Sequence, residues 1–182
     1  GCPFGHFPNL VTIRGDRYRD ALTVAAAVQT VLDLGAETIL YGHHGPVVGA
    51  ELIKTELTAL RDAIVYVHDE TVKGMNAGKS VHTLMAEIAL PPELEVGEGY
   101  GKVSWSVRAI WENYAGWFKH TSTTELYDQP QQVVHADLLE LAGGANAIVA
   151  RAQQKLAENH PVAALHLLDI ALSQESPSAA AI

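Results

Sequence analysis

The sequence predicts a mainly helical chain with a small α/β portion at its N-terminal end. From residue 51 to residue 173, apolar side chains recur every three or four positions, with short polar breaks between the runs. This spacing is the period of an α-helix that packs one face against a core. Only two short stretches, 10–13 and 38–41, combine β-branched and other apolar residues as strands do. We therefore expect helices to dominate and strands to be few.

Composition places the chain among acidic globular proteins. Its 182 residues are 48% hydrophobic, which is enough for one substantial core. The formal charge is -9 and the lysines and arginines are scattered, so we expect no nucleic acid partner. No run approaches the ~20 apolar residues that span a bilayer. We expect a soluble protein with no membrane partner, and the sequence does not decide between the cytoplasm and the periplasm.

A single cysteine, Cys2, limits the covalent and metal chemistry of the chain. One cysteine excludes an intrachain disulfide and a zinc site built from several thiolates. Any metal ligands would have to be His, Asp or Glu.

The N-terminal portion predicts a strand, a helix and a second strand in that order. The strand over 10–13 is followed by a helix over 16–34, whose apolar residues form one broad face. Gly35 stands where helices commonly end. With a second strand over 38–41, the pattern is that of a βαβ-like unit. Its sheet partners must come from elsewhere, because two strands alone are not stable.

Two adjacent histidines follow the second strand in the stretch 40-LYGHHGPVVG-49. Polar side chains between a strand and a Gly/Pro turn are well placed to reach a ligand cleft at the carboxyl end of the strand. Two neighbouring imidazoles nevertheless lack the separated partners that a metal site requires. The pattern alone leaves two interpretations of His43 and His44 open: a ligand-binding role, or loop histidines that bond to nearby backbone.

Two helices are expected after the histidine turn. The first, over 51–75, carries a narrow apolar seam suited to packing against another helix. The seam consists of Ile53, Leu57, Leu60, Ile64 and Val67. The second helix begins after Ser80, a favourable N-cap, and stops before Pro91. His68 lies on another face of the first helix, so we expect it to be a solvated or structural residue.

A glycine-rich loop follows, with Gly97, Gly99 and Gly101. Glycine permits positive φ and lets a ligand approach the backbone closely. Because no Lys-Ser or Lys-Thr pair follows, the phosphate signal is weak. We interpret the loop as a turn, with phosphate binding as the alternative.

All three tryptophans fall in one predicted helix over 103–118. Trp105, Trp111 and Trp117 stand there together with Tyr114 and Phe118. Because each aromatic ring removes a large area from water, this density indicates a core or a subunit contact. The alternative is an apolar wall of a substrate site.

Three further helices are expected over 131–142, 145–158 and 161–173, separated by breaks rich in Gly, Asn and Pro. The last two resemble one helical hairpin of a tetratricopeptide-like array. The small-residue tail over 176–182 is expected to fray.

Five ordered stretches resemble one known family. They are 9-NLVTIRGDRYRDAL-22, 42-GHHGPV-47, 61-RDAIVYVHDETVKGMNAGK-79, 97-GEGYGKVSWSVRAIWENYAGWF-118 and 141-LAGGANAIVARAQQKL-156. In this order they are similar to the alkylsulfatase-type branch of the metallo-β-lactamase superfamily. The resemblance implies that residues 1–48 are the end of an αββα catalytic domain and that residues 49–182 are the helical alkylsulfatase dimerisation domain.

The same resemblance implies a role for the histidine turn. His43 aligns with the last histidine of the family's two-zinc site, and His44 would contact the ligands or the substrate. In that family a zinc-bound hydroxide attacks a sulfate or other ester. The other ligands would lie before Gly1, so we expect this chain alone to retain no zinc and to be inactive. Alkylsulfatases carry a His-Asn pair where Trp105 and Ser106 stand here, which favours a different ester or an amide as the substrate, because neither is a general acid at neutral pH.

Two classes of function remain from the sequence. In the first, the chain belongs to a zinc hydrolase whose helical part dimerises and covers the catalytic cleft. In the second, it is a non-catalytic dimerisation or assembly module. Homodimer interfaces are typically large and apolar, so both classes predict an apolar contact between two copies. The residues expected in that contact are Ile53, Leu57, Leu60, Ile64, Trp111 and Trp117.

Overall fold

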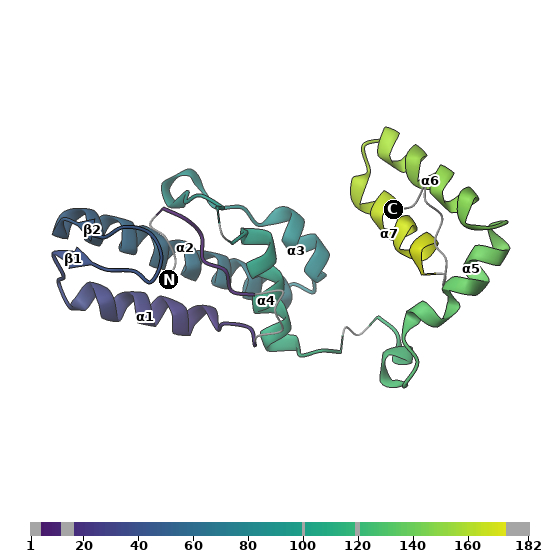
Figure 1. Ribbon diagram of the computed structural model, residues 1–182. Helices are drawn as coiled ribbons and strands as arrows, with labels where there is room; N and C mark the ends of the chain where they lie inside the picture. The colour runs from purple at the N-terminus through teal and green to yellow at the C-terminus, as the bar shows by residue number, and fades with distance from the viewer. Residues whose placement is uncertain (1–4, 12–16, 100, 119–120, 174–182) are drawn as a thin grey trace. The chain divides into compact units, whose positions relative to one another are not determined.

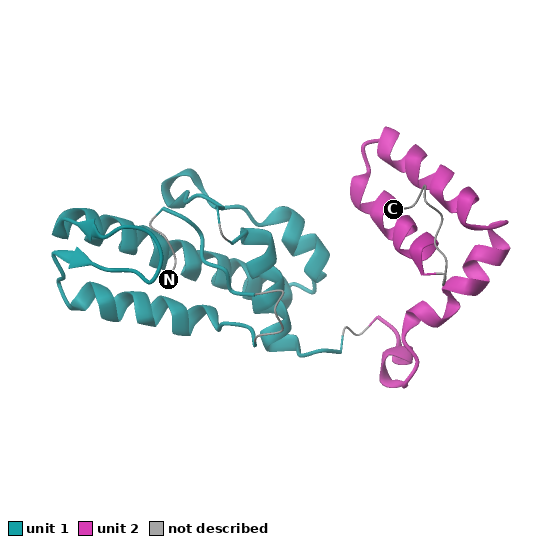
Figure 2. Ribbon diagram, in the orientation of Figure 1, with its two compact units in different colours: residues 1–119 teal, residues 120–182 magenta. Residues whose placement is uncertain are grey.

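The computed structural model describes residues 5–11, 17–99, 101–118 and 121–173. The chain divides into two compact units, residues 1–119 and residues 120–182 (Figure 2). Among the described residues, the first unit carries the two short strands and the α-helices α1 to α4, and the second carries α5 to α7 (Figure 1). The mainly helical fold predicted from the sequence is thus confirmed. The division into compact units falls after residue 119 and does not test the domain boundary expected at residue 48, which stays a prediction.

Helix α1 (Ala21–Asp33) begins later than the sequence pattern indicated. Residues 17–20 are not helical, and the side chain of Asp20 caps the helix by accepting hydrogen bonds from the Thr23 backbone N–H (2.7 Å) and hydroxyl (2.8 Å). A capping carboxylate satisfies backbone donors that otherwise have no partner in the first turn, and it fixes where the helix starts. At the other end, the Gly35 N–H donates to the carbonyl of Leu32, as expected for a helix terminus.

The two strands form a hairpin and not the expected βαβ-like unit. Strand β1 (Thr38–Ile39) pairs antiparallel with β2 (Val47–Val48), the strand that follows it. An antiparallel pair needs only a short connection, and the Gly/Pro turn after residue 41 supplies one. The strand expected over 10–13 is not seen at Leu10 and Val11, and its other two residues lie outside the described residues.

Helix α2 (Ala50–Asn76) is the central element of the first unit, and α1 packs along it (Figure 1). Its predicted seam is buried inside this chain. Ile53, Leu57, Leu60, Ile64 and Val67 are 3%, 7%, 8%, 0% and 0% exposed. Packing of the seam against other helices is therefore confirmed, but those helices are the chain's own α1 and α4. The structure gives no support for placing Ile53, Leu57, Leu60 and Ile64 in a dimer interface, because a side chain already enclosed in its own core presents no surface to a partner.

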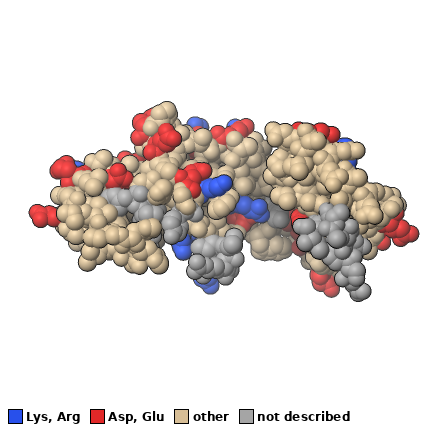
Figure 3. Space-filling view, turned by 45° about the horizontal axis from the view of Figure 1, so that its top comes forward, with Lys and Arg blue, Asp and Glu red and all other residues tan. Residues whose placement is uncertain are grey.

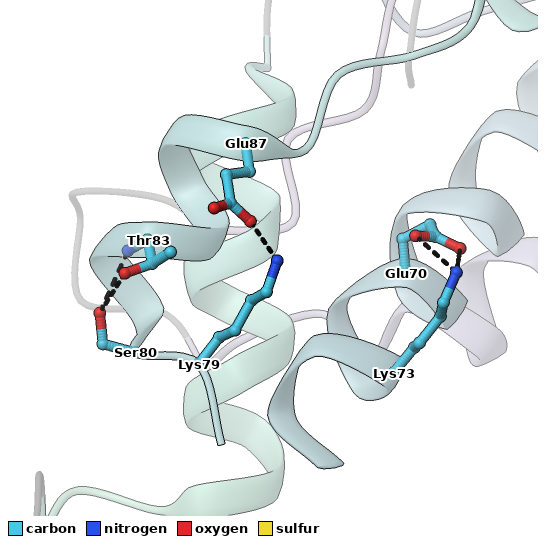
Figure 4. Close-up of polar contacts among 6 residues, drawn as sticks. All are labelled: Glu70, Lys73, Lys79, Ser80, Thr83 and Glu87. Atoms are coloured by element: carbon cyan, nitrogen blue, oxygen red, sulfur yellow. Dashed lines mark hydrogen bonds and ion pairs between the residues drawn. The ribbon is translucent and has the colours of Figure 1, made fainter. Parts of the chain in front are cut away.

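Helix α3 (Val81–Glu87) starts where the sequence predicted. The Ser80 hydroxyl accepts a hydrogen bond from the Thr83 backbone N–H at 3.2 Å (Figure 4). The ammonium of Lys79, just before the helix, reaches the carboxylate of Glu87 at 2.5 Å. This pair links the two ends of a helix of only seven residues.

The glycine-rich loop lies against the N-terminal segment. After the 3-10 turn η1 (Pro92–Leu94), the carbonyl of Gly97 accepts from the Phe7 N–H and the Gly97 N–H donates to Gly5, both at 2.6 Å. A Cβ added at Gly101 would lie 2.2 Å from the carbonyl oxygen of Pro8. Close packing against residues 5–9 thus explains these glycines, since an added Cβ at Gly97 or Gly99 would meet the His6 ring; the loop is not a simple turn.

Helix α4 (Val103–Ala115) closes the core of the first unit. Its buried face includes Val107 and Ile110, which pack toward α2 and α3. The helix ends three residues before the predicted limit because Gly116 adopts φ 76°, a left-handed conformation that terminates helices. Trp117 and Phe118 therefore follow the helix and are not part of it.

The second unit is a small helical assembly. Two 3-10 turns, η2 (Thr123–Leu126) and η3 (Gln131–Val134), precede the α-helices. These are α5 (His135–Leu141), α6 (Ala145–Ala157) and α7 (Pro161–Leu172). The predicted hairpin of the last two is confirmed, since α6 packs against α7 around Ile148, Val149 and Ala171. The tail expected to fray lies outside the described residues.

None of the described helices is by itself both long and apolar enough to cross a bilayer. The segments Gln131–Leu141 and Ala145–Ala157 reach the required length and composition only when taken together, and they are bent by 98° at the break between them.

Candidate functional site

The histidine turn lies between the two strands of the hairpin. His43 and His44 both occupy the loop that joins β1 to β2, and both are exposed. His44 has φ 68°, a left-handed conformation that few non-glycine residues adopt. The loop therefore has a defined, constrained shape, and it holds both imidazoles at the surface.

The donor set around this turn is small. Among the residues that the structure describes, no group of three or more His, Cys, Asp or Glu side chains could hold a metal ion. His43 can thus contribute one imidazole, but the described residues do not form a zinc site by themselves, since structural and catalytic zinc sites need at least three protein ligands. Further ligands would have to come from beyond these residues.

Exposed apolar side chains occur on the segments that flank the histidine turn. The end of α1, the hairpin and the start of α2 lie together at one end of the first unit (Figure 1). Four large apolar side chains are exposed there, and we call them the hairpin-end patch. They are Leu34 (74% exposed), Leu40 (78%), Val48 (67%) and Leu52 (49%). Grouped exposed apolar residues of this kind mark interaction surfaces.

The aromatic residues of α4 and of the segment that follows it separate into two environments. Trp111 is half-buried against the core of the first unit. Trp105 and Trp117 are 45% and 70% exposed. The ammonium of Lys102 lies 5.4 Å from the centre of the Trp105 ring. The expected core role fits Trp111, whereas Trp105 and Trp117 present aromatic surface to the solvent.

Trp105 and Ser106 differ in their exposure. Trp105 faces outward, while Ser106 is 1% exposed and its hydroxyl has no hydrogen-bond partner. Neither side chain titrates near neutral pH. The segment therefore offers no general acid at these two positions.

A second polar site centres on His68, for which the sequence alone predicts only a solvated or structural role. The imidazole is 7% exposed, and both ring nitrogens have partners. Nδ1 lies 2.8 Å from Oδ1 of Asp69, and Nε2 lies 2.7 Å from the hydroxyl of Tyr114. The spacing held a signal for this burial, since position 68 lies one helical turn after the seam residue Ile64.

Polar contacts around His68 join three helices. Asn113 on α4 donates to Asp20 at the start of α1 (3.2 Å), and Arg108 donates to Glu112 (2.8 Å). Tyr18 donates its hydroxyl hydrogen bond to the Glu112 carboxylate, and this bond raises the pKa of Tyr18. The pKa of Asp20 is lowered, chiefly by its two hydrogen bonds from Thr23.

Charged side chains are spread over the surface. On the face shown in Figure 3, acidic and basic groups alternate with broad uncharged areas. The sequence holds 21 acidic and 12 basic residues, so the acidic groups outnumber the basic ones. On this face the basic groups do not form a continuous stripe.

These features define a mainly helical chain with one short antiparallel hairpin, a histidine turn within that hairpin and exposed aromatic groups on α4. The family model for alkyl sulfatase dimerisation matches residues 80–182. The chain therefore belongs to the alkyl sulfatase dimerisation family.

Known proteins similar to this chain are alkylsulfatases. It is 34% identical over 150 residues to a linear primary-alkylsulfatase of Pseudomonas sp., a match that covers 80% of this chain and 28% of that protein. It is 29% identical to the alkyl/aryl-sulfatase BDS1 of Saccharomyces cerevisiae, over 81% of this chain and 24% of that protein. The solved structure of the stereoselective inverting sec-alkylsulfatase Pisa1 from Pseudomonas sp. superposes with a TM-score of 0.84 at 26% identity, covering 98% of this chain and 29% of that one. The chain thus spans 24% to 29% of the length of these relatives.

Proposed function

We propose that this chain forms part of a zinc-dependent hydrolase of the metallo-β-lactamase type, which cleaves a sulfate ester or another ester. The observation that carries the proposal is the exposed His43 in the constrained loop after β1. Membership of the alkyl sulfatase dimerisation family supports it, as do relatives that are named alkylsulfatases. When bound, a zinc pair would activate water for the hydrolysis.

The role of His43 is that of one zinc ligand, with His44 beside it. A neutral imidazole held on a rigid turn binds zinc well when other ligands complete the site. The test uses a longer protein that carries this chain. His43→Ala should reduce bound zinc and lower ester hydrolysis at least about tenfold, whereas His166→Ala, at an exposed position of the second unit, should change neither. Unchanged zinc content and activity in the His43 variant would remove His43 from the site.

The substrate of the longer protein should differ from a simple alkyl sulfate. Trp105 and Ser106 leave the segment without an imidazole that could protonate a leaving alcohol. Hydrolysis of matched alkyl sulfates and carboxylic esters by the longer protein tests this choice. We expect the carboxylic esters to be cleaved faster, and a preference for alkyl sulfates would contradict it.

We also propose that the chain self-associates as a homodimer and that its helical part covers the catalytic cleft. The exposed Trp117 supplies aromatic surface of the kind found in interfaces, and the half-buried Trp111 lies six residues before it. The hairpin-end patch suits contact with the remainder of the catalytic domain, because its residues lie on the segments that flank the histidine turn. We therefore propose the exposed aromatic residues, and not the buried seam of α2, for the dimer contact.

A non-catalytic dimerisation or assembly module is the second candidate. The observation in its favour is that the described residues contain no group of three potential metal ligands. The test has two steps, of which the first is metal analysis of the purified 182-residue chain. Two zinc ions per chain would require ligands that the described residues do not supply, whereas a metal-free chain that still dimerises fits both the module and a fragment of the hydrolase. Zinc-dependent turnover by the longer protein then selects the hydrolase.

A further inference from the structure

Three residues of the first unit form a hydrogen-bonded chain from a carboxylate through an imidazole to a phenol. Asp69 Oδ1 lies 2.8 Å from His68 Nδ1, and His68 Nε2 lies 2.7 Å from the Tyr114 hydroxyl. An ionised carboxylate can only accept, so the neutral imidazole must donate from Nδ1 and accept at Nε2. The Tyr114 hydroxyl therefore donates its proton toward Nε2. This is the order of a nucleophile, a base and an orienting acid.

We propose that Tyr114 is a nucleophilic acceptor for acyl groups from activated carboxylic esters, with His68 as its base and Asp69 as the residue that orients the base. The phenolic oxygen attacks the ester carbonyl while its proton moves to His68 Nε2. The bond from the carbonyl carbon to the leaving oxygen breaks, and the leaving group departs as an alcohol with the proton returned by His68. The products are an acyl-tyrosine and an alcohol, and no oxidant or metal takes part.

Burial and charge favour this assignment. Tyr114 is 55% exposed, so a small ester can reach the residue, whereas His68 is 7% exposed and kept from bulk water. The rings of Tyr114 and His68 lie 5.7 Å apart between centroids. A positive charge that develops on His68 has Asp69 on its own helix and Asp20 at the start of α1 to stabilise it, and His68 is itself among the groups that lower the pKa of Asp20, after the Thr23 hydrogen bonds.

Other tyrosines of the chain provide matched internal controls. The Tyr18 hydroxyl is bonded to the Glu112 carboxylate, which raises the pKa of Tyr18 and disfavours its reactive anion. Tyr127 is more exposed than Tyr114, at 74%, and is bonded to no histidine among the described residues. If exposure alone decided the reactivity, Tyr127 would react first. If the base decides it, Tyr114 reacts first.

The experiment exposes the full 182-residue chain to p-nitrophenyl acetate in the presence of a zinc chelator. Release of p-nitrophenol is followed by absorbance, and the acetylated residue is located by peptide mass mapping. We expect one equivalent of p-nitrophenol per chain, without further turnover, and acetylation of Tyr114 at least about tenfold faster than of Tyr127 or Tyr18, as general base catalysis can supply. Equal rates at Tyr114 and Tyr127 would overturn the proposal.

Three variants distinguish loss of the proposed base from loss of the folded structure. Tyr114→Phe should abolish the one-equivalent release. Asp69→Asn, at a largely exposed side chain, should leave the circular dichroism spectrum unchanged and slow the acetylation of Tyr114 by about tenfold or more, because the imidazole loses its orienting acceptor. His68→Gln should bring Tyr114 to the rate of Tyr127. An unchanged Tyr114 rate in both the Asp69 and the His68 variants would refute the assigned base. The outcome is independent of His43, since the reaction is run without zinc.

Discussion

The imidazole of His68 on α2 and the hydroxyl of Tyr114 on α4 lie 2.7 Å apart, between Nε2 and the phenolic oxygen. The two residues are separated by 46 positions in the sequence, so their hydrogen bond joins two helices across the core of the first unit. The other ring nitrogen of His68, Nδ1, lies 2.8 Å from Oδ1 of Asp69. A buried imidazole with both nitrogens satisfied contributes to stability, and it costs free energy when either partner is lost.

The first prediction concerns this hydrogen bond. His68→Ala should lower the free energy of unfolding by about 2 to 4 kcal/mol, since it removes a buried, packed imidazole and leaves the Tyr114 hydroxyl without its acceptor. Tyr114→Phe should cost about 1 kcal/mol. Urea denaturation measures both. His166→Ala, at a position where the side chain is 78% exposed, is the control and should stay within about 0.5 kcal/mol of the parent chain.

The second prediction concerns the close approach of the glycine loop to the N-terminal segment. Gly101→Ala should destabilise the first unit by about 1 to 3 kcal/mol, because the new Cβ would lie 2.2 Å from the carbonyl oxygen of Pro8. Gly42→Ala is the matched control, with no atom within 4 Å of the added Cβ. Thermal unfolding of both variants is the measurement. Equal midpoints would show that the segment moves aside without cost.

Much of this fold could be predicted from the sequence because it depends on local periodicity and capping. The seam of α2, the Ser80 cap and the α6–α7 hairpin all follow from spacings within one element. The pairing of β1 with β2 could not be read in this way, because two-residue strands give almost no pattern and depend on a nonlocal contact. Spacing also does not show which helix packs on the seam of α2. The sequence alone therefore cannot distinguish a helix of the same chain from a helix of a second copy.

The candidate sites also differ in whether local sequence can reveal them. His43 could be singled out because it stands between a strand and a Gly/Pro turn, and a resemblance to a family gave it a role. The contact of His68 with Tyr114 could not be predicted, because it depends on how α2 and α4 cross. A cluster assembled from distant residues appears only when the packing is known.

The third prediction tests the charge at the start of α1. Hydrogen bonds from Thr23 hold the pKa of Asp20 below its unfolded value of about 3.9. A lowered folded pKa gives stability that is present above the unfolded pKa and is lost as the pH falls through the folded pKa. The parent chain should therefore lose more stability than Asp20→Asn between about pH 5 and about pH 2. Asparagine keeps the cap but cannot titrate, so urea midpoints with parallel pH profiles would contradict the assignment.

The fourth prediction concerns the cap of α3. Ser80→Ala should lower the free energy of unfolding by about 1 kcal/mol. Removing the Ser80 hydroxyl leaves the Thr83 backbone N–H without its acceptor. Ser80→Asp should restore most of the loss, because aspartate caps as well as serine does. Chemical denaturation of the two variants checks this. A Ser80→Ala variant as stable as the parent chain would mean that water replaces the hydroxyl at no cost.

The last prediction is self-association through the exposed aromatic surface that follows α4. Trp117 is 70% exposed in a family described by its dimerisation, so a second copy that covers this ring would remove a large apolar area from water. Trp117→Asp should shift the chain from dimer to monomer and raise the dimer dissociation constant at least about a hundredfold, because a charge at the centre of an apolar contact is costly. Tyr127→Asp, at a residue that is 74% exposed in the second unit, should leave the dimer intact. Sedimentation at low micromolar concentration measures both variants, and circular dichroism confirms that each is folded. A parent chain that sediments as a monomer, or a Trp117 variant that dimerises as well as the parent, would place the contact elsewhere and leave Trp117 to a role in the catalytic cleft.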